Sequence, residues 1–125
     1  MVNLRRDMIQ GLVRLRILRA AAIRPASGVE LSQDLATAGH EVSPGTLYPL
    51  LHDMEKAGWL KSTGKTVRGK RRRYYRATKK GRAQLQQAVA LLGQFLVGIV
   101  GVPLAETPPS VLDDGIARTT VRLSG

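Results

Sequence analysis

The sequence has no cysteine and only two histidines, His40 and His52. Without cysteine there is neither a disulfide framework nor thiol chemistry, which fits a reducing compartment. The two histidines have no partner at ligand spacing, so no zinc site is predicted. We therefore expect no metal and no other cofactor.

Acidic residues are scarce, and the shortage is local. The chain has 20 Lys and Arg against 9 Asp and Glu, a net charge of +11. Eleven of the basic residues lie between Lys61 and Arg82, a segment without any acidic residue, and the other nine balance the nine acids. A localised positive field of this kind points to a nucleic-acid backbone, an anionic membrane surface or an acidic partner.

Catalytic patterns are also missing. No nucleophile, base and orienting group occur together. The stretch TGKT (63–66) resembles the end of a phosphate-binding loop, but five residues separate Gly58 from Gly64 where that loop has four. We expect no enzyme activity.

The N-terminal segment lacks the uncharged apolar core of a secretory signal, because Arg residues interrupt it every few positions. It faintly resembles an Arg-rich transit peptide, but Asp7 and the helical pattern that follows argue against that interpretation. We expect a cytoplasmic protein that is nucleoid-associated when bound to DNA.

Two helices are predicted before residue 40. The first ends at Pro25, and the second begins at Ser27, which can form a capping box with Glu30 and which is followed by a stop at Gly39. Helical spacing predicts that the first helix buries Met8, Leu12, Leu15, Leu18 and Ala22, and that the second buries Val29, Leu31, Leu35 and Ala38.

The third helix has the clearest signals. Ser43 is a favourable N-cap, Pro44 fits the first turn, and Gly58 ends the helix, while Pro49 predicts a slight kink. Only residues 39–42 separate it from the second helix, which makes the pair a helix-turn-helix candidate. The predicted inward residues are Leu47, Leu50, Leu51 and Met54.

After Gly58 the pattern becomes that of strands. Residues 59–62 and 73–77 are the predicted strands of a β-hairpin, with a flexible tip that contains Gly64 and Gly69. Strand alternation should bury one of the adjacent Tyr74 and Tyr75 and leave the other near a DNA face. A fourth helix is predicted from Lys79, capped by Thr78.

Three helices followed by a basic hairpin indicate a winged helix-turn-helix, mainly α with a β-hairpin wing. We expect a DNA-binding domain over 1–78, a dimerisation helix over 79–100 and a C-terminal arm or tail over 101–125. In this fold the third helix enters the major groove and the wing follows the backbone. The predicted DNA contacts are Ser43, Gly45, Thr46, Tyr48 and His52 in the recognition helix, and Arg68, Lys70, Arg71, Arg72 and Tyr74 in the wing. For Tyr48 the alternative is a place in the core, and for His52 a neutral exposed position.

Two segments, VSPGTLYPLLHDMEKAGWL (42–60) and KRRRYYRATKKGRAQL (70–85), resemble the PadR-like transcriptional regulators. They match that family's Ser-Pro-Gly-Thr-Leu-Tyr-Pro-Leu-Leu helix and its Tyr-Tyr-x-x-Thr-x-x-Gly wing exit, and the resemblance extends over about residues 8–96. It implies a homodimeric repressor, joined through the C-terminal helix and released by a small-molecule effector of unidentified class. One departure is Ser27-Gly28-Val29-Glu30-Leu31, where the family has His-Gly-Tyr-Glu-Leu, so no ligand residue is carried over from that region.

Residues 83–105 contain no charge. A membrane span within 88–104 is one interpretation, which Gln94 and three glycines weaken. A dimerisation helix fits better, because it needs an apolar face that a partner covers, and we expect no membrane partner. The predicted dimer residues are Leu85, Val89, Leu92, Phe95, Leu96 and Ile99.

The sequence therefore predicts a sequence-specific DNA-binding transcriptional regulator that acts as a homodimer on a double-stranded operator. The alternative is a basic protein that binds RNA or DNA without sequence preference.

Overall fold

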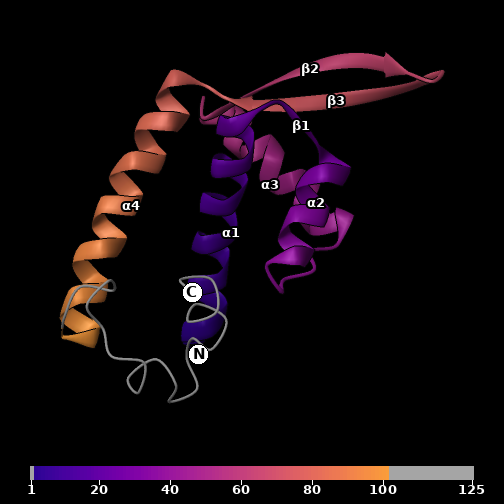
Figure 1. Ribbon diagram of the computed structural model, residues 1–125. Coiled ribbons are helices and arrows are strands. Elements are labelled where there is room, and N and C mark those ends of the chain that lie inside the picture. Colours follow the sequence, from indigo (N-terminus) through magenta and orange to yellow (C-terminus); the bar gives the residue numbers. More distant parts are fainter. Residues whose placement is uncertain (1, 102–125) are drawn as a thin grey trace. The chain divides into compact units, whose positions relative to one another are not determined.

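The computed structural model describes residues 2–101. Its elements are α1 (Leu4–Ile23), β1 (Ala26–Ser27), α2 (Gly28–Thr37), α3 (Pro44–Lys56), β2 (Leu60–Val67), β3 (Lys70–Ala77) and α4 (Lys79–Val100). The strands form one antiparallel sheet in the order β1-β3-β2, and α1, α2 and α3 lie on one side of it (Figure 1). The predicted fold class, mainly α with a β-hairpin wing, is confirmed.

The chain divides into two compact units, and the boundary falls between Gln86 and Gln87, inside α4. The first turns of this helix belong to the first unit because Gly81 is buried there and Leu85 packs against its core. The boundary therefore lies about two turns beyond the predicted end of the DNA-binding domain at residue 78. Apart from Gly101, the predicted C-terminal arm lies outside the described residues.

The core of the first unit joins the three helices to the base of the sheet. Its largest fully buried side chains come from α1, α2, α3 and β2 and are Ile17, Leu18, Leu31, Leu35, Leu47, Leu51, Met54 and Leu60. Tyr75 closes the core from β3, with 6% of its surface exposed. The inward residues predicted for the third helix are thus confirmed, with Leu50 partly buried.

The stripe predicted for α1 is partly wrong. Leu18 is buried as predicted, but Met8 and Leu12 are 55% and 44% exposed, and the other residues that α1 buries are Val13, Ile17 and Ala21. The N-terminal half of this helix carries apolar residues on more than one face, so periodicity alone could not decide which stripe meets the core. In α2 the same correction applies to Val29, which is 49% exposed, and to the exposed Ala38.

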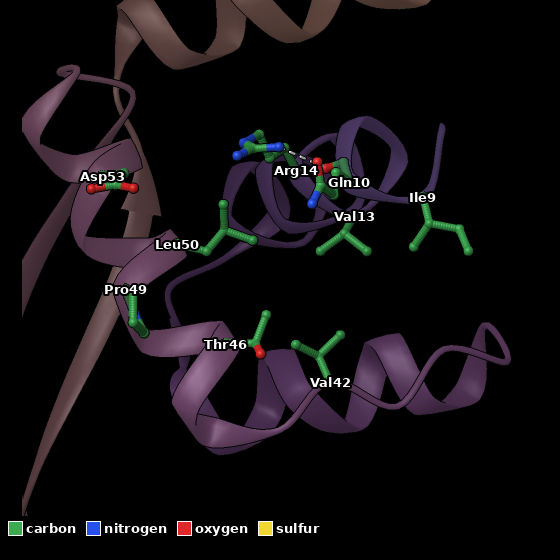
Figure 2. Close-up of a pocket in the computed structure, with 9 residues that line it drawn as sticks. All are labelled: Ile9, Gln10, Val13, Arg14, Val42, Thr46, Pro49, Leu50 and Asp53. Atoms are coloured by element: carbon green, nitrogen blue, oxygen red, sulfur yellow. Dashed lines mark hydrogen bonds between the residues drawn. The ribbon is translucent and has the colours of Figure 1, made fainter. Parts of the chain in front are cut away.

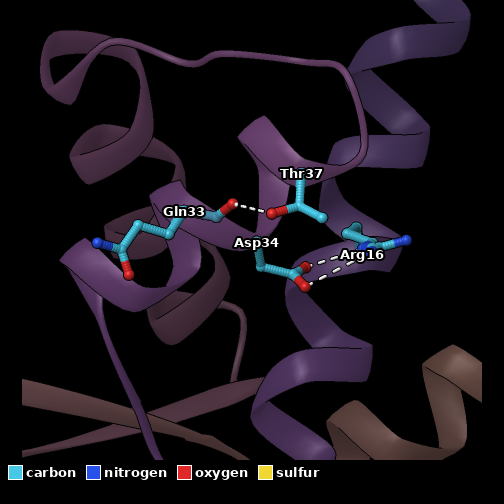
Figure 3. Close-up of polar contacts among 4 residues, drawn as sticks. All are labelled: Arg16, Gln33, Asp34 and Thr37. Carbon is cyan, nitrogen blue, oxygen red and sulfur yellow. Dashed lines mark hydrogen bonds and ion pairs between the residues drawn. The ribbon is translucent and has the colours of Figure 1, made fainter.

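Helix α2 begins and ends as predicted. Ser27 Oγ accepts a hydrogen bond from the Glu30 N–H at 3.2 Å, and Glu30 Oε1 accepts one from the Ser27 N–H at 3.0 Å. These bonds hold the pKa of Glu30 below its usual value, with the Ser27 N–H as the largest cause. Arg16 of α1 donates to both carboxylate oxygens of Asp34, at 2.8 and 3.3 Å, and so ties α1 to α2 (Figure 3).

Helix α3 begins at Pro44 and is followed by Gly58 in the left-handed conformation, as its signals predict. Between α1 and α3 lies a cavity of about 280 Å³ (Figure 2). Its lining combines the apolar residues Ile9, Val13, Val42, Pro49 and Leu50 with the polar residues Gln10, Arg14, Thr46 and Asp53. One flank of α3 therefore faces α1 across this cavity.

The hairpin strands are longer than predicted, and the prediction that Gly64 belongs to the tip is wrong. Gly64 lies inside β2 opposite Arg73, and only Arg68 and Gly69 form the turn. A Cβ on Gly64 would come within 2.8 Å of the Arg71 guanidinium, so a glycine here lets that side chain lie across the strand. A glycine that serves such an approach cannot be distinguished from a turn glycine by sequence.

The exit from the hairpin into α4 is fixed by Thr78. Its hydroxyl donates to the Gly58 carbonyl at 2.5 Å and accepts from the Gly81 N–H at 3.0 Å, while its own N–H donates to the Trp59 carbonyl. A Cβ on Gly81 would collide with the Trp59 carbonyl oxygen. This geometry gives a physical reason for the Thr-x-x-Gly pattern after the two tyrosines: the threonine caps α4, and the glycine allows the helix to touch the chain that follows α3.

Candidate nucleic-acid interface

The N-terminal end of α3 is open to solvent. Its predicted contact residues Ser43, Gly45, Thr46, Tyr48 and His52 are all exposed. Ser43 is the N-cap residue, but its hydroxyl donates to Thr46 Oγ1 at 3.2 Å and does not cap a backbone N–H. Pro44 has no N–H, and the Thr46 and Leu47 N–H groups both donate to the Ser43 carbonyl, so the first turn leaves the Gly45 N–H and the positive end of the helix dipole available to an anion.

The predicted recognition residues do not all point the same way. Gly45 and His52 lie near the centre of the exposed face, whereas Thr46 and Tyr48 are two positions apart and so lie about 160° from each other around the helix. Thr46 lines the cavity toward α1 (Figure 2), and Tyr48 lies on the opposite flank against α2. A groove-bound helix would thus present these two side chains at its two edges.

Tyr48 is half-exposed rather than part of the core, with 45% of its surface accessible. Its ring covers Gly28, where an added Cβ would lie 2.6 Å from the hydroxyl oxygen. Gly28 is buried at the start of α2, so the absence of a side chain there allows the ring to lie flat between the two helices. The chain holds Tyr48 in place while leaving its edge accessible.

The hairpin has two chemically different faces. Directly paired residues share a face, and the pairs Leu60–Ala77 and Ser62–Tyr75 point toward the helices. We call this side the inner face; farther out it carries Gly64, Thr66, Arg71 and Arg73. The other side, the outer face, carries Lys61, Thr63, Lys65, Val67, Lys70, Arg72, Tyr74 and Arg76. The predicted wing residues are therefore divided: Arg71 is on the inner face, and Lys70, Arg72 and Tyr74 are on the outer one.

The predicted burial of one of the two adjacent tyrosines is confirmed. Tyr75 is buried on the inner face, and Tyr74 is only partly covered on the outer face. Burial raises the pKa of Tyr75.

A hydrogen-bonded chain connects α3 to both long strands. Glu55 Oε2 accepts from the Ser62 hydroxyl at 2.6 Å and from the Ser62 N–H at 3.0 Å, and Arg73 donates to the same hydroxyl at 2.9 Å. The Ser62 hydroxyl is the largest cause of a lowered pKa at Glu55. The recognition helix and the wing are thereby held in one fixed relation.

The turn at the tip of the wing has an unusual residue. Arg68 has φ 52° and Gly69 has φ 77°, which is the pattern of a type I′ turn. Asn or Gly is the usual residue at the first position, because Gly has no Cβ and Asn tolerates the left-handed conformation, whereas most other side chains are strained there. This chain places a cation at that position instead.

The six predicted dimer residues differ in exposure. Leu85 packs against the core of the first unit and Leu96 is half-buried, while Val89, Leu92, Phe95 and Ile99 are 45–78% exposed. By length and hydropathy α4 could also cross a membrane, but one such helix is weak evidence.

Four other cations of the hairpin, Lys61, Lys65, Arg73 and Arg76, are not among the predicted DNA contacts. All four are exposed on the two long strands. All four belong to the basic segment of the sequence, but only the register of the hairpin shows which face each one occupies.

An open helix N-terminus held beside a cationic hairpin is the arrangement of a winged helix-turn-helix that binds nucleic acid. Residues 17–87 match the transcriptional regulator PadR-like family, and the chain belongs to that family. Its members are transcriptional regulators, and they bind DNA.

Several relatives support this assignment. The chain is 43% identical over 96 residues to the transcriptional regulator Rv3488 of Mycobacterium tuberculosis. The matched region covers 77% of this chain and 90% of the relative. A PadR family regulator from Eggerthella lenta has a similar structure, with a TM-score of 0.70, 30% identity and coverage of 82% of this chain and 88% of the other. The PadR-like regulator BC4206 from Bacillus cereus gives a TM-score of 0.68 and 33% identity, over 74% and 92% of the two chains.

Proposed function

We propose that this protein is a dimeric repressor that recognises a specific operator through α3 and the wing. An effector then releases the repressor from the operator. The single observation that carries the proposal is the Glu55–Ser62–Arg73 connection, which holds an exposed helix N-terminus and a cationic hairpin in one rigid unit. Reading a groove while gripping the adjacent backbone requires such a fixed relation.

The tip of the wing supports the same function. Arg68 occupies a backbone conformation that favours glycine or asparagine. A strained residue that persists at an exposed tip suggests a role for its side chain. Contact between the guanidinium and the phosphates or the minor groove gives Arg68 that role.

Dimerisation is supported by exposed apolar surface in each unit. In the second unit Val89, Phe95 and Ile99 are 55%, 63% and 78% exposed. In the first unit Leu4 and Met8 of α1 are 69% and 55% exposed. Surfaces of this kind are covered by a partner in most soluble proteins that carry them.

Selection of bound duplexes from a random pool tests sequence specificity. The selected duplex should compete against bulk DNA with a clear preference at fixed salt, typically 10³-fold or more for a specific regulator, as an order of magnitude. A ratio near one would instead favour the alternative, a basic protein that binds RNA or DNA indifferently. Flotation of the intact chain with anionic vesicles would reveal the membrane interpretation of α4.

Substitutions should separate recognition from backbone contact. Thr46→Ala with Tyr48→Ala should reduce the preference for the selected duplex, because these side chains lie at the edges of the recognition helix. Arg71→Ala with Arg72→Ala should weaken binding to all duplexes alike and lower the salt slope by about two. Identical behaviour of the two pairs in the same competition would contradict this division.

A further inference from the structure

The outer face of the wing carries more charge than contact with one operator explains. It presents five exposed cations, Lys61, Lys65, Lys70, Arg72 and Arg76, whereas the inner face presents only Arg71 and Arg73. In residues 2–101 the ion pairs are Arg16–Asp34 and Arg24–Glu30, so no outer-face cation forms an ion pair within that range, although the charge of Arg72 helps to lower the pKa of Glu30.

Like charges face one another across the strands of the outer face. Lys61 is paired with Arg76, and Lys65 with Arg72. Like charges directly opposite each other destabilise a hairpin. The two inner-face cations avoid this cost, because Arg71 lies opposite Thr66 and Arg73 opposite Gly64. The repulsion is therefore confined to one face, where a bound polyanion would relieve it.

The direction of the outer face determines which polyanion it can meet. Helix α3 bonds to the hairpin from the inner side, through Glu55 and Ser62, and α1, α2 and α3 all lie on that side (Figure 1). Each long strand has 8 residues and spans about 27 Å. Duplex DNA resists bending over lengths of roughly 150 base pairs. One duplex seated on α3 can therefore meet the outer face only near the tip of the wing, where Lys70 and Arg72 lie, and it cannot fold over the hairpin to cover the base of that face.

We propose that the outer face binds the phosphate backbone of a second DNA duplex, so that the protein at its operator also holds another segment of DNA. Tyr74 and Thr63, which are paired on this face, add hydroxyl donors that suit phosphate oxygens. The inference rests on the DNA binding proposed above and adds a second partner site to it.

The test uses the full-length chain bound to an immobilised operator duplex and measures capture of a labelled duplex that lacks the operator. Lys61→Glu with Lys65→Glu turns both like-charge pairs into opposite-charge pairs, so the hairpin should stay folded. Capture should fall about tenfold or more, with a salt slope lower by about two, while operator binding is largely kept. The matched control is Arg5→Glu with Arg6→Glu, which makes the same charge change in the first turn of α1, at the end away from the sheet (Figure 1), and should keep capture.

Three results would overturn the inference: capture by the Lys61→Glu/Lys65→Glu variant at the wild-type level, equal loss in both variants, or wild-type complexes that take up single-stranded RNA or anionic vesicles but no second duplex. Failure of the proposed function would appear differently. The labelled duplex could be captured through the outer face whichever immobilised duplex the protein is bound to, with no preference for the operator. That result would contradict the repressor proposal and leave the second site supported.

Discussion

At the scale of single residues, Glu55 contributes most to the arrangement that recognition needs. One of its carboxylate oxygens accepts both hydrogen bonds from Ser62, and no other side chain in the described residues bonds α3 directly to the wing. Its lowered pKa reflects these bonds. The residue thus links local chemistry to the spacing between the two elements that we propose contact DNA.

Glu55→Gln should destabilise the protein by about 1 kcal/mol at neutral pH, because a charge-assisted hydrogen bond becomes a neutral one. A lowered pKa in the folded state means that the stabilisation is complete above the ordinary glutamate pKa and is lost as the pH falls through the lowered value. Urea unfolding of both proteins should therefore differ most at pH 7 and converge in acid. Glu41→Gln, at an exposed position, is the control and should show no such difference.

Arg68 separates stability from function at the tip of the wing. Arg68→Asn should stabilise the hairpin by up to about 1 kcal/mol, because Asn adopts the left-handed conformation more easily. The same change should weaken DNA binding and lower the salt slope by about one. Arg68→Lys keeps the charge and should bind with nearly the original affinity. A variant with Asn that binds as tightly as wild type would remove Arg68 from the interface.

At the scale of elements, several specific contacts fix the junction between the hairpin and α4. Thr78 bonds to Gly58 and Gly81, and α4 passes against the Trp59 carbonyl at Gly81. The end of α3, the wing and the first turn of α4 meet at this point, so the junction sets how these three elements leave the core.

Gly81→Ala should lower stability by about 1–3 kcal/mol, because the added methyl group collides with backbone rather than with a movable side chain. Gly11→Ala in α1 is the matched control: a Cβ there meets nothing within 4 Å, and alanine is the better helix former. Thermal unfolding should therefore move in opposite directions for the two variants. Equal shifts would mean that the contact with Trp59 does not matter.

Prediction from sequence succeeded where local signals decide the structure. The capping box at Ser27, the start at Pro44 and the stops at Gly39 and Gly58 are local chemistry, and all are observed. It failed where long-range packing decides: Met8 and Leu12 face solvent, Gly64 is a strand residue, and β1 was not predicted. The candidate site residues could be proposed from the sequence as a set, but their division between two wing faces depends on a pairing register that no local signal fixes.

At the scale of the whole molecule, the proposal requires two copies of the DNA-binding unit. Two recognition helices in successive major grooves lie about 34–36 Å apart, and the operator should then be a pseudo-palindrome with that spacing. The exposed apolar residues of α4 are the surface that we propose holds the copies together. Sedimentation at working concentrations should show a dimer, and a chain that remains monomeric would contradict the two-site geometry.

The salt dependence of duplex affinity tests the central claim, that α3 and the wing together grip a DNA backbone. A dimer that makes roughly six to ten phosphate contacts should lose about 10³–10⁵-fold in affinity between 50 and 200 mM salt. Arg71→Ala with Arg72→Ala should flatten that dependence measurably. An affinity that hardly changes over this range in the wild-type protein would contradict the account.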